Sequence, residues 1–161
     1  MGPDKLLGTP NPDAIYGLGA PDSLRGAEGN DYISGAQGGD LLYGGPGDDV
    51  LLGGFGNDLI RGGDGNDFLE GGWGQDILRG ENGNDRIYGG PWNDALLGGS
   101  GNDKLVGGVG GGNRYGGGRG NDVIHSSNGQ RENVFCGPGR DVVRADRSDR
   151  LVGCERVFYG D

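Results

Sequence analysis

An aspartate recurs every nine residues from Asp4 to Asp103 without one shift in register, and this period constrains the fold more than any other feature. A branched aliphatic residue stands two positions after each aspartate, from Leu6 to Leu105. A disordered acidic segment has no reason to keep such spacing, whereas tandem copies of one short structural unit must keep it. Glycine does not recur at every third position, so a collagen triple helix is excluded.

The repeating unit is clearest in residues 53–61, GGFGNDLIR. Its first six residues have the composition of a turn, because glycine adopts positive φ angles and Asn or Asp caps the turn. Its last three residues form a minimal strand with one inward aliphatic side chain. Such a strand is stable only when it stacks on copies of itself, so we expect a solenoid. Two units complete one coil of 18 residues, and two thin parallel sheets face each other, with residue i beside residue i+18 at roughly 4.8 Å.

Composition agrees with a solenoid and with a charged repeat. Glycine accounts for 42 of the 161 residues and hydrophobic residues for 32%, so a conventional globular core is not expected. The formal net charge is −10, and residues 1–106 alone hold 17 acidic and 6 basic residues. The excess negative charge therefore lies in the repeats. No apolar run approaches the ~18 residues that a membrane span needs.

Stacked coils would place aspartates that are 18 residues apart within a few ångströms of each other, where their carboxylates repel unless a cation lies between them. Turn carbonyls add oxygen donors, and the repeats contain no His or Cys. This donor set suits Ca²⁺, which takes 6–8 oxygens in irregular geometry, better than Mg²⁺ or zinc. Nine divalent ions in the nine gaps between Asp13 and Asp103 would overcompensate the net charge of −10, so we expect fewer ions or some weak sites. The candidate metal ligands are Asp13, Asp22, Asp31, Asp40, Asp49, Asp58, Asp67, Asp76, Asp85, Asp94 and Asp103.

The units resemble the repeats-in-toxin (RTX) nonapeptide GGxGxDxUx, a calcium-binding β-helix repeat. The match is close over residues 8–106 and looser toward both ends. Units that carry it include GGPGDDVLL (44–52), GGFGNDLIR (53–61), GGDGNDFLE (62–70), GGWGQDILR (71–79) and GGSGNDKLV (98–106). The resemblance implies an all-β fold, a right-handed parallel β-roll, with calcium ions between the turns of successive coils.

The resemblance also implies which residues hold calcium. The sixth-position aspartates of two successive coils would clamp one ion, together with turn carbonyls, so Asp49 and Asp67 hold one ion and Asp58 and Asp76 another. The implied carbonyl donors of the first ion are Gly44, Gly45, Gly47, Gly62, Gly63 and Gly65. Those of the second are Gly53, Gly54, Gly56, Gly71, Gly72 and Gly74.

Several units depart from the motif. Trp92 stands where the fourth glycine belongs, and because Trp tolerates positive φ poorly we expect a distorted or weak site at Asp94. After Asp103 the register breaks: Gly112 occupies the next position, and the motif resumes one residue late with Asp122, so sites should fade there. Among the units that begin at residue 26 or later, the second glycine is replaced by Ala27, Ala36 and Glu81.

We expect one domain over residues 1–161. It comprises a degenerate first coil that caps the stack (1–25), the regular array (26–106), interrupted repeats (107–125) and a C-terminal cap (126–161). Cys136 and Cys154 are 18 residues apart, so stacking would bring their Cα atoms to about 5 Å, within disulfide range. A bridge would indicate an oxidising compartment, and the alternative is two buried free thiols. Val143 and Val152 are expected to continue the inward row.

Residues 136–157 resemble the terminal segment of secreted actinobacterial proteins with such repeats. Five arginines in this region are nearly balanced by acidic residues, so we expect pairing within the chain and no nucleic-acid partner. The arginines are Arg140, Arg144, Arg147, Arg150 and Arg156. No nucleophile–base pair or HExxH motif is present, so we expect no catalytic residues.

Two functions are consistent with the sequence. The first is calcium binding by the repeats of an extracellular, secreted protein whose folding depends on the ion. The second is a structural or adhesive surface module, or a non-catalytic part of a larger exoprotein, in which calcium acts only as a stiffener. In that case Phe55, Trp73, Tyr43 and Tyr88 would form one outer flank for a protein or glycan partner.

Overall fold

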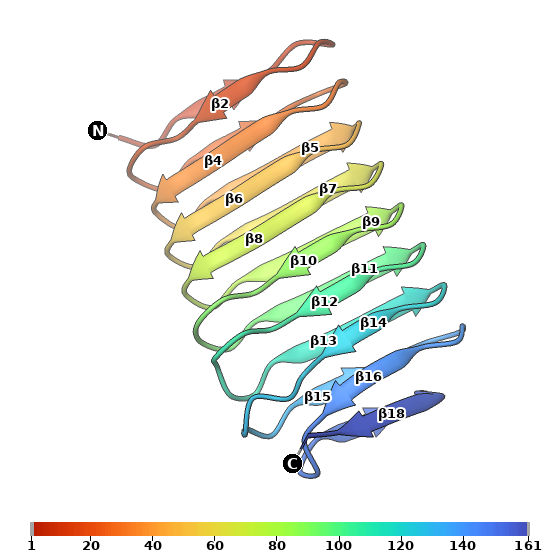
Figure 1. The fold of residues 1–161 in the computed structure, drawn as a ribbon. Helices are drawn as coiled ribbons and strands as arrows, with labels where there is room; N and C mark the ends of the chain where they lie inside the picture. Colours follow the sequence, from red (N-terminus) through yellow and green to blue (C-terminus); the bar gives the residue numbers. More distant parts are fainter. Residues whose placement is uncertain (1, 161) are drawn as a thin grey trace.

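The computed structural model describes residues 2–160 and shows a parallel β-solenoid of about nine coils (Figure 1). Successive strands alternate between two nine-stranded parallel sheets, which we call the odd sheet and the even sheet after the strand numbers. The odd sheet contains β1 (Lys5–Leu7), β3 (Ser23–Arg25), β5 (Leu41–Pro46), β7 (Leu59–Asp64), β9 (Ile77–Asn82), β11 (Ala95–Ser100), β13 (Arg114–Arg119), β15 (Asn133–Phe135) and β17 (Arg150–Val152). The even sheet contains β2 (Ala14–Tyr16), β4 (Tyr32–Gln37), β6 (Val50–Phe55), β8 (Phe68–Trp73), β10 (Arg86–Tyr88), β12 (Lys104–Val106), β14 (Val123–His125), β16 (Val142–Ala145) and β18 (Arg156–Tyr159).

The register confirms the predicted coil of 18 residues in the regular array. Leu51 pairs with Leu69 in the even sheet, and Ile60 pairs with Leu78 in the odd sheet. Each coil therefore places every repeat position directly over the same position of the coil before. The column of any one position then runs the length of the roll.

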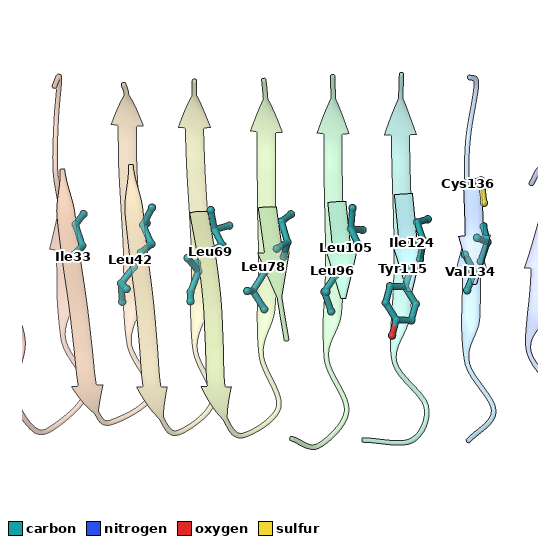
Figure 2. Close-up of a cluster of buried hydrophobic side chains, with 14 of the residues drawn as sticks. Ile33, Leu42, Leu69, Leu78, Leu96, Leu105, Tyr115, Ile124, Val134 and Cys136 are labelled. Carbon is teal, nitrogen blue, oxygen red and sulfur yellow. The ribbon is translucent and has the colours of Figure 1, made fainter. Parts of the chain in front are cut away.

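The core is a double row of single aliphatic side chains between the two sheets (Figure 2). The inward residue of every unit from Leu24 to Leu105 has 0% exposure. Leu6 faces the same row but keeps 38% exposure, because β1 is the end of its sheet and no further coil covers it. Each unit buries only one large apolar side chain, so the core is thin and depends on stacking.

The central strands are longer than predicted. Strands such as β6 continue through the first three positions of the next unit, so the expectation of a six-residue turn and a three-residue strand was wrong there. The ladder continues because glycine at the second position pairs across coils at positive φ, as Gly45 (φ 121°) does with Gly63 (φ 124°). The true turn is confined to positions four to six.

The C-terminal coils are pinned by a disulfide. Cys136 and Cys154 are bonded, with their Cα atoms 5.2 Å apart, which confirms the pairing expected from their spacing. Val143 is fully buried as predicted, but Val152 is 43% exposed. Leu151 takes the inward place instead, because it pairs with Val134 only 17 residues earlier and the last coil is one residue short. The prediction for Val152 was therefore wrong.

The arginine-rich segment does not pair with its acidic neighbours, contrary to expectation. Arg61–Glu81, at 4.0 Å, is the one ion pair found within residues 2–160. The acidic side chains accept backbone N–H groups instead: Asp146 accepts from Asn128 and Asp149 from Glu132. An unpaired buried N–H group costs more free energy than a solvated guanidinium group gains from a surface ion pair. The carboxylates therefore accept the backbone N–H groups. Among the described residues no helix is long and apolar enough to cross a membrane.

Candidate metal centre

Aspartates at the sixth position form two columns, one along each edge of the roll. The even column precedes the strands of the even sheet and contains Asp13, Asp31, Asp49, Asp67, Asp85, Asp103, Asp122 and Asp141. The odd column precedes the strands of the odd sheet and contains Asp4, Asp22, Asp40, Asp58, Asp76 and Asp94. Every predicted aspartate ligand therefore lies in one of the two columns.

Successive aspartates of a column are in direct contact through one carboxylate oxygen. The backbone N–H of Asp49 donates to Asp67 Oδ1 at 2.9 Å, and that of Asp58 donates to Asp76 Oδ1 at 2.8 Å. The same bond recurs from coil to coil, so it fixes the side-chain orientation of the column aspartates from Asp22 onward. It satisfies a turn N–H that would otherwise lack a partner.

The second carboxylate oxygen of these residues is buried and has no hydrogen-bond partner. Asp49, Asp67 and Asp85 are 1–2% exposed, so water does not compensate this oxygen. The unpartnered Oδ2 atoms belong to Asp22, Asp31, Asp40, Asp49, Asp58, Asp67, Asp76, Asp85, Asp94, Asp103, Asp122 and Asp141. A buried, uncompensated carboxylate is costly, so the two columns are incomplete as protein alone.

Burial shifts the pKa values of aspartates in the middle of the columns. Burial raises the pKa of Asp67 to about 7, with further increases from the carboxylates of Asp85 and Asp49, while the N–H of Asp49 opposes the rise. Burial likewise raises the pKa of Asp58 to about 6. Near neutral pH these columns either hold protons or need a cation.

A backbone carbonyl of the next coil lies near the unpartnered oxygen in each regular unit. A Cβ built on Gly44 would overlap Asp49 Oδ2 and would lie 2.7 Å from the carbonyl oxygen of Gly62 in the next coil. The carbonyls of Gly45 and Gly47 abut the equivalent glycines of that coil. No three His, Cys, Asp or Glu side chains gather at one point in the described part of the chain, so carbonyls must complete any ion's shell.

These features fit Ca²⁺. Its preferred donors are oxygens, several of them backbone carbonyls, and the columns offer carboxylate oxygens that no other group uses. The residues that would hold it are the paired aspartates and the first-, second- and fourth-position glycines named from the resemblance. Such an ion supplies positive charge and oxygen coordination, and no redox chemistry.

The replacement of the fourth-position glycine by Trp92 does not distort the turn as predicted. Trp92 adopts φ 86° and still makes the turn, and Asp94 keeps the regular arrangement, with Oδ1 accepting the Asp76 N–H at 2.9 Å. The expected distortion at Asp94 is therefore absent. Asp13 differs from the other aspartates because its Oδ2 accepts the Thr9 hydroxyl at 3.0 Å.

The register after Asp103 also differs from the prediction. Asn113, not Gly112, follows Asp94 in the odd column, because the turn between them is one residue longer. The even column continues through Asp122 and Asp141, which are fully buried and bonded like the others. Asp141 was not among the predicted ligands, although the 19-residue spacing of Asp103, Asp122 and Asp141 indicates a continuing column.

The proposed aromatic flank is divided among different surfaces. Tyr43 lies in β5 of the odd sheet and Tyr88 in β10 of the even sheet, so the expectation of one shared flank was wrong. Phe55 and Trp73 do lie together, with ring centroids 6.2 Å apart and planes inclined by 17°. Both are more than half exposed.

The sequence model of the RTX calcium-binding nonapeptide repeat matches the chain four times, at residues 7–42, 43–78, 70–105 and 79–113. No curated protein matches the chain. RTX nonapeptide repeats bind several Ca²⁺ ions, so calcium ions are the ligands of this roll. Rolls of this kind are structural calcium-binding modules and are generally non-catalytic. The matches together span residues 7–113, and the structure has two regular columns of aspartates whose Oδ2 atoms lack a partner. The chain therefore belongs to the family of RTX calcium-binding nonapeptide repeat proteins.

Proposed function

We propose that this chain is a secreted module whose folding depends on calcium. The observation that carries the proposal is the row of buried aspartate Oδ2 atoms without a partner. Unfolded, these carboxylates are hydrated and far apart. Folded without a cation, they are buried side by side, and the ordering of 42 glycines adds an entropic cost. Binding of calcium to the folded state alone would therefore drive folding.

The residues assigned to the ions follow the two columns. In the even column, Asp49 and Asp67 would share one ion with the carbonyls of Gly44, Gly45, Gly47, Gly62, Gly63 and Gly65. In the odd column, Asp58 and Asp76 would share another with those of Gly53, Gly54, Gly56, Gly71, Gly72 and Gly74. The remaining aspartates from Asp13 to Asp103 would act alike, and Asp122 and Asp141 extend the even column. Residues 1–25 and 126–161 would serve as end caps.

An extracellular location follows from the affinity expected of such sites and from the disulfide. Extracellular calcium modules typically bind at about 10⁻⁴–10⁻³ M, so the chain would stay unfolded at cytosolic calcium levels. The Cys136–Cys154 bridge suits an oxidising compartment. RTX proteins are typically secreted. The roll would then fold only after export.

Circular dichroism with chelator and with millimolar calcium tests calcium-dependent folding. We expect a strand spectrum only with calcium, and identical spectra would refute the proposal. Asp67→Asn should lose at least one bound ion, because it neutralises a carboxylate that faces two gaps. Asp64→Asn is the matched control, since Asp64 is an exposed third-position residue of the same repeat unit, outside the aspartate columns, and should keep the wild-type ion count.

A second candidate function is adhesion, and the exposed Phe55–Trp73 pair favours it. In this case calcium stiffens a scaffold that presents the two rings to a protein or glycan. The double variant Phe55→Ala/Trp73→Ala should then bind calcium normally but lose retention on a glycan array or cell surface that retains the wild-type chain. Unchanged retention of the variant would exclude this pair as the contact surface.

A further inference from the structure

The even column continues one step beyond Asp141. In the even sheet Val142 pairs with Arg156. The residues before this pair, Asp141 and Glu155, therefore occupy the same place in successive turns. The N–H of Asp141 donates to Glu155 Oε2 at 2.9 Å, as the N–H of Asp122 donates to Asp141. Only 14 residues separate Asp141 from Glu155, so the regular spacing of the column does not reveal this last member.

The disulfide holds Glu155 in this place. Glu155 directly follows Cys154, which is bonded to Cys136, the first-position residue of the previous even turn. The Cα atoms of the two cysteines are 5.2 Å apart. Glu155 is exposed, and the strand that follows it, β18, forms the edge of the even sheet at the C-terminal end of the roll (Figure 1). The bridge, and not a further coil, therefore positions this carboxylate.

Asp141 is the buried member of the pair. It is 0% exposed, and its Oδ2 has no hydrogen-bond partner. Burial raises the pKa of Asp141, the N–H of Asp122 opposes the rise, and the Glu155 carboxylate adds to it. Within residues 2–160 no Lys or Arg forms an ion pair with either carboxylate. The protein therefore brings two like charges together and places no cation of its own beside them.

The last turn also stands off from the turn that carries Asp141. In a regular coil, a Cβ built on the second-position glycine would overlap the carbonyl of the coil before, as at Gly63 with Gly45. In the last turn, a Cβ built on Gly153 would come only to 4.0 Å from the carbonyl oxygen of Gly137. The second-position carbonyl is therefore less crowded here than in the regular array, which leaves room for a ligand.

The odd column ends differently, at Asp149, the residue before β17. Its Oδ1 accepts the N–H of Glu132 at 2.9 Å. Its Oδ2 accepts the Ser126 hydroxyl at 2.8 Å and the Asp146 N–H at 2.9 Å. The protein itself satisfies both oxygens of this terminal carboxylate, whereas the pair that ends the even column keeps an unpartnered buried oxygen.

We propose that Asp141 and Glu155 hold a calcium ion at the C-terminal end of the even column, in a site formed by the disulfide-bonded cap instead of two nonapeptide units. This inference rests on the proposed function of the columns. The two carboxylates and the Gly137 carbonyl would supply the protein ligands, and water completes the shell on the open side, as Ca²⁺ sites commonly permit. The end of the odd column at Asp149 would bind no ion.

Ion counting on a Glu155 variant tests this site. Glu155→Gln removes the charge but keeps the length of the side chain and an oxygen that accepts the Asp141 N–H. Because Glu155 is exposed, the variant should fold, and it should bind one calcium ion fewer than the wild type at about 1 mM calcium. Glu70→Gln is the matched control, since it makes the same change at an exposed strand residue outside the columns and should keep the wild-type count.

Atomic emission of dialysed protein and calorimetric titration give the count, circular dichroism shows that each variant folds, and amide hydrogen exchange locates the ion. Loss of one ion with faster exchange confined to β16 and β18 would support the site. A folded Glu155→Gln variant with the wild-type count would overturn it, and so would loss of an ion that leaves exchange in both strands unchanged. A wild-type chain that binds no calcium would instead refute the proposed function.

Discussion

At the scale of single residues, the glycines of the repeat have two different reasons to be glycine. The first-position glycine is required by space, because its Cβ would overlap the aspartate of its own unit. The second-position glycine has a positive φ, and a Cβ there would overlap a carbonyl of the neighbouring coil, yet that position also accepts Ala27, Ala36 and Glu81 at φ 95°, 73° and 80°. The first position is stricter in the sequence: every first position from Gly8 to Gly117 is glycine. The overlap with a carboxylate held by the ladder is therefore tolerated less than the overlap and the positive φ of the second position.

A methyl group at one first position tests this contact. Gly62→Ala should destabilise the calcium-loaded roll by about 1–3 kcal/mol, the usual cost of overpacking, and should weaken calcium binding because Asp67 must move. Urea titration in calcium and calorimetry measure the two effects. Gly19→Ala is the control, since a Cβ there meets nothing within 4 Å and its φ is not positive. Equal stability of the two variants would remove the contact as the reason for glycine.

At the scale of elements, short strands are held in place by ladders in the turns. The fifth-position side chains of the even-column turns bond to backbone N–H groups of the next coil. Asn66 Oδ1 accepts from Asn84 at 3.0 Å, and Asn84 Oδ1 accepts from Asn102 at 2.7 Å. This ladder lies outside the aspartate column and satisfies a second set of turn donors. The turns are therefore linked from coil to coil by hydrogen bonds of their own.

The period of the sequence was enough to predict the strands, the inward row and the two columns, because each depends only on repetition. The strand length was mispredicted because Gly44-Gly45 looks like a turn in isolation and pairs as a strand only in the stack. The positions of Asn113 and Leu151 were mispredicted because the unit before Asn113 gains a residue and the unit before Leu151 loses one. The 19-residue spacing of Asp103 and Asp122 shows that a residue is inserted between them, but only the three-dimensional register places it before Asn113.

The disulfide acts on the terminal elements and not on the whole roll. A bridge that closes a loop of this size contributes roughly 3 kcal/mol in the chain-entropy view, and a solenoid transmits stability mainly between neighbouring coils. Cys136→Ser/Cys154→Ser should therefore speed amide hydrogen exchange in β15–β18 while β5–β9 keep their wild-type rates. The calcium count of the regular array provides the control. Uniformly faster exchange along the chain would show that the bridge stabilises the roll as one cooperative unit.

At the scale of the whole molecule, the proposed calcium dependence makes charge, rather than apolar burial, the factor that decides whether the roll forms. Its net charge is −10, and its most deeply buried charged groups are aspartates of like sign in two lines. Each unit contributes one inward aliphatic residue, so the core cannot outweigh a column of uncompensated carboxylates. Anything that neutralises the columns should favour the folded state. Calcium is one such agent and the proton is another.

The effect of pH on the calcium-free chain separates these two agents. Burial raises the pKa of Asp49 to about 6 and of Asp67 to about 7 in the roll, whereas unfolded aspartates titrate near 3.8. The folded state therefore binds protons more tightly, and its stability rises as pH falls from about 7 toward 4 and is lost again as pH rises. In chelator, the strand signal in circular dichroism should increase between pH 7.5 and 5, whereas calcium affinity should decrease over the same range because protons compete for the same oxygens. Asp64→Asn/Glu70→Gln removes two exposed carboxylates outside the columns and should leave both trends intact. A calcium-free chain whose spectrum does not change with pH would show that repulsion within the columns is not what keeps it unfolded.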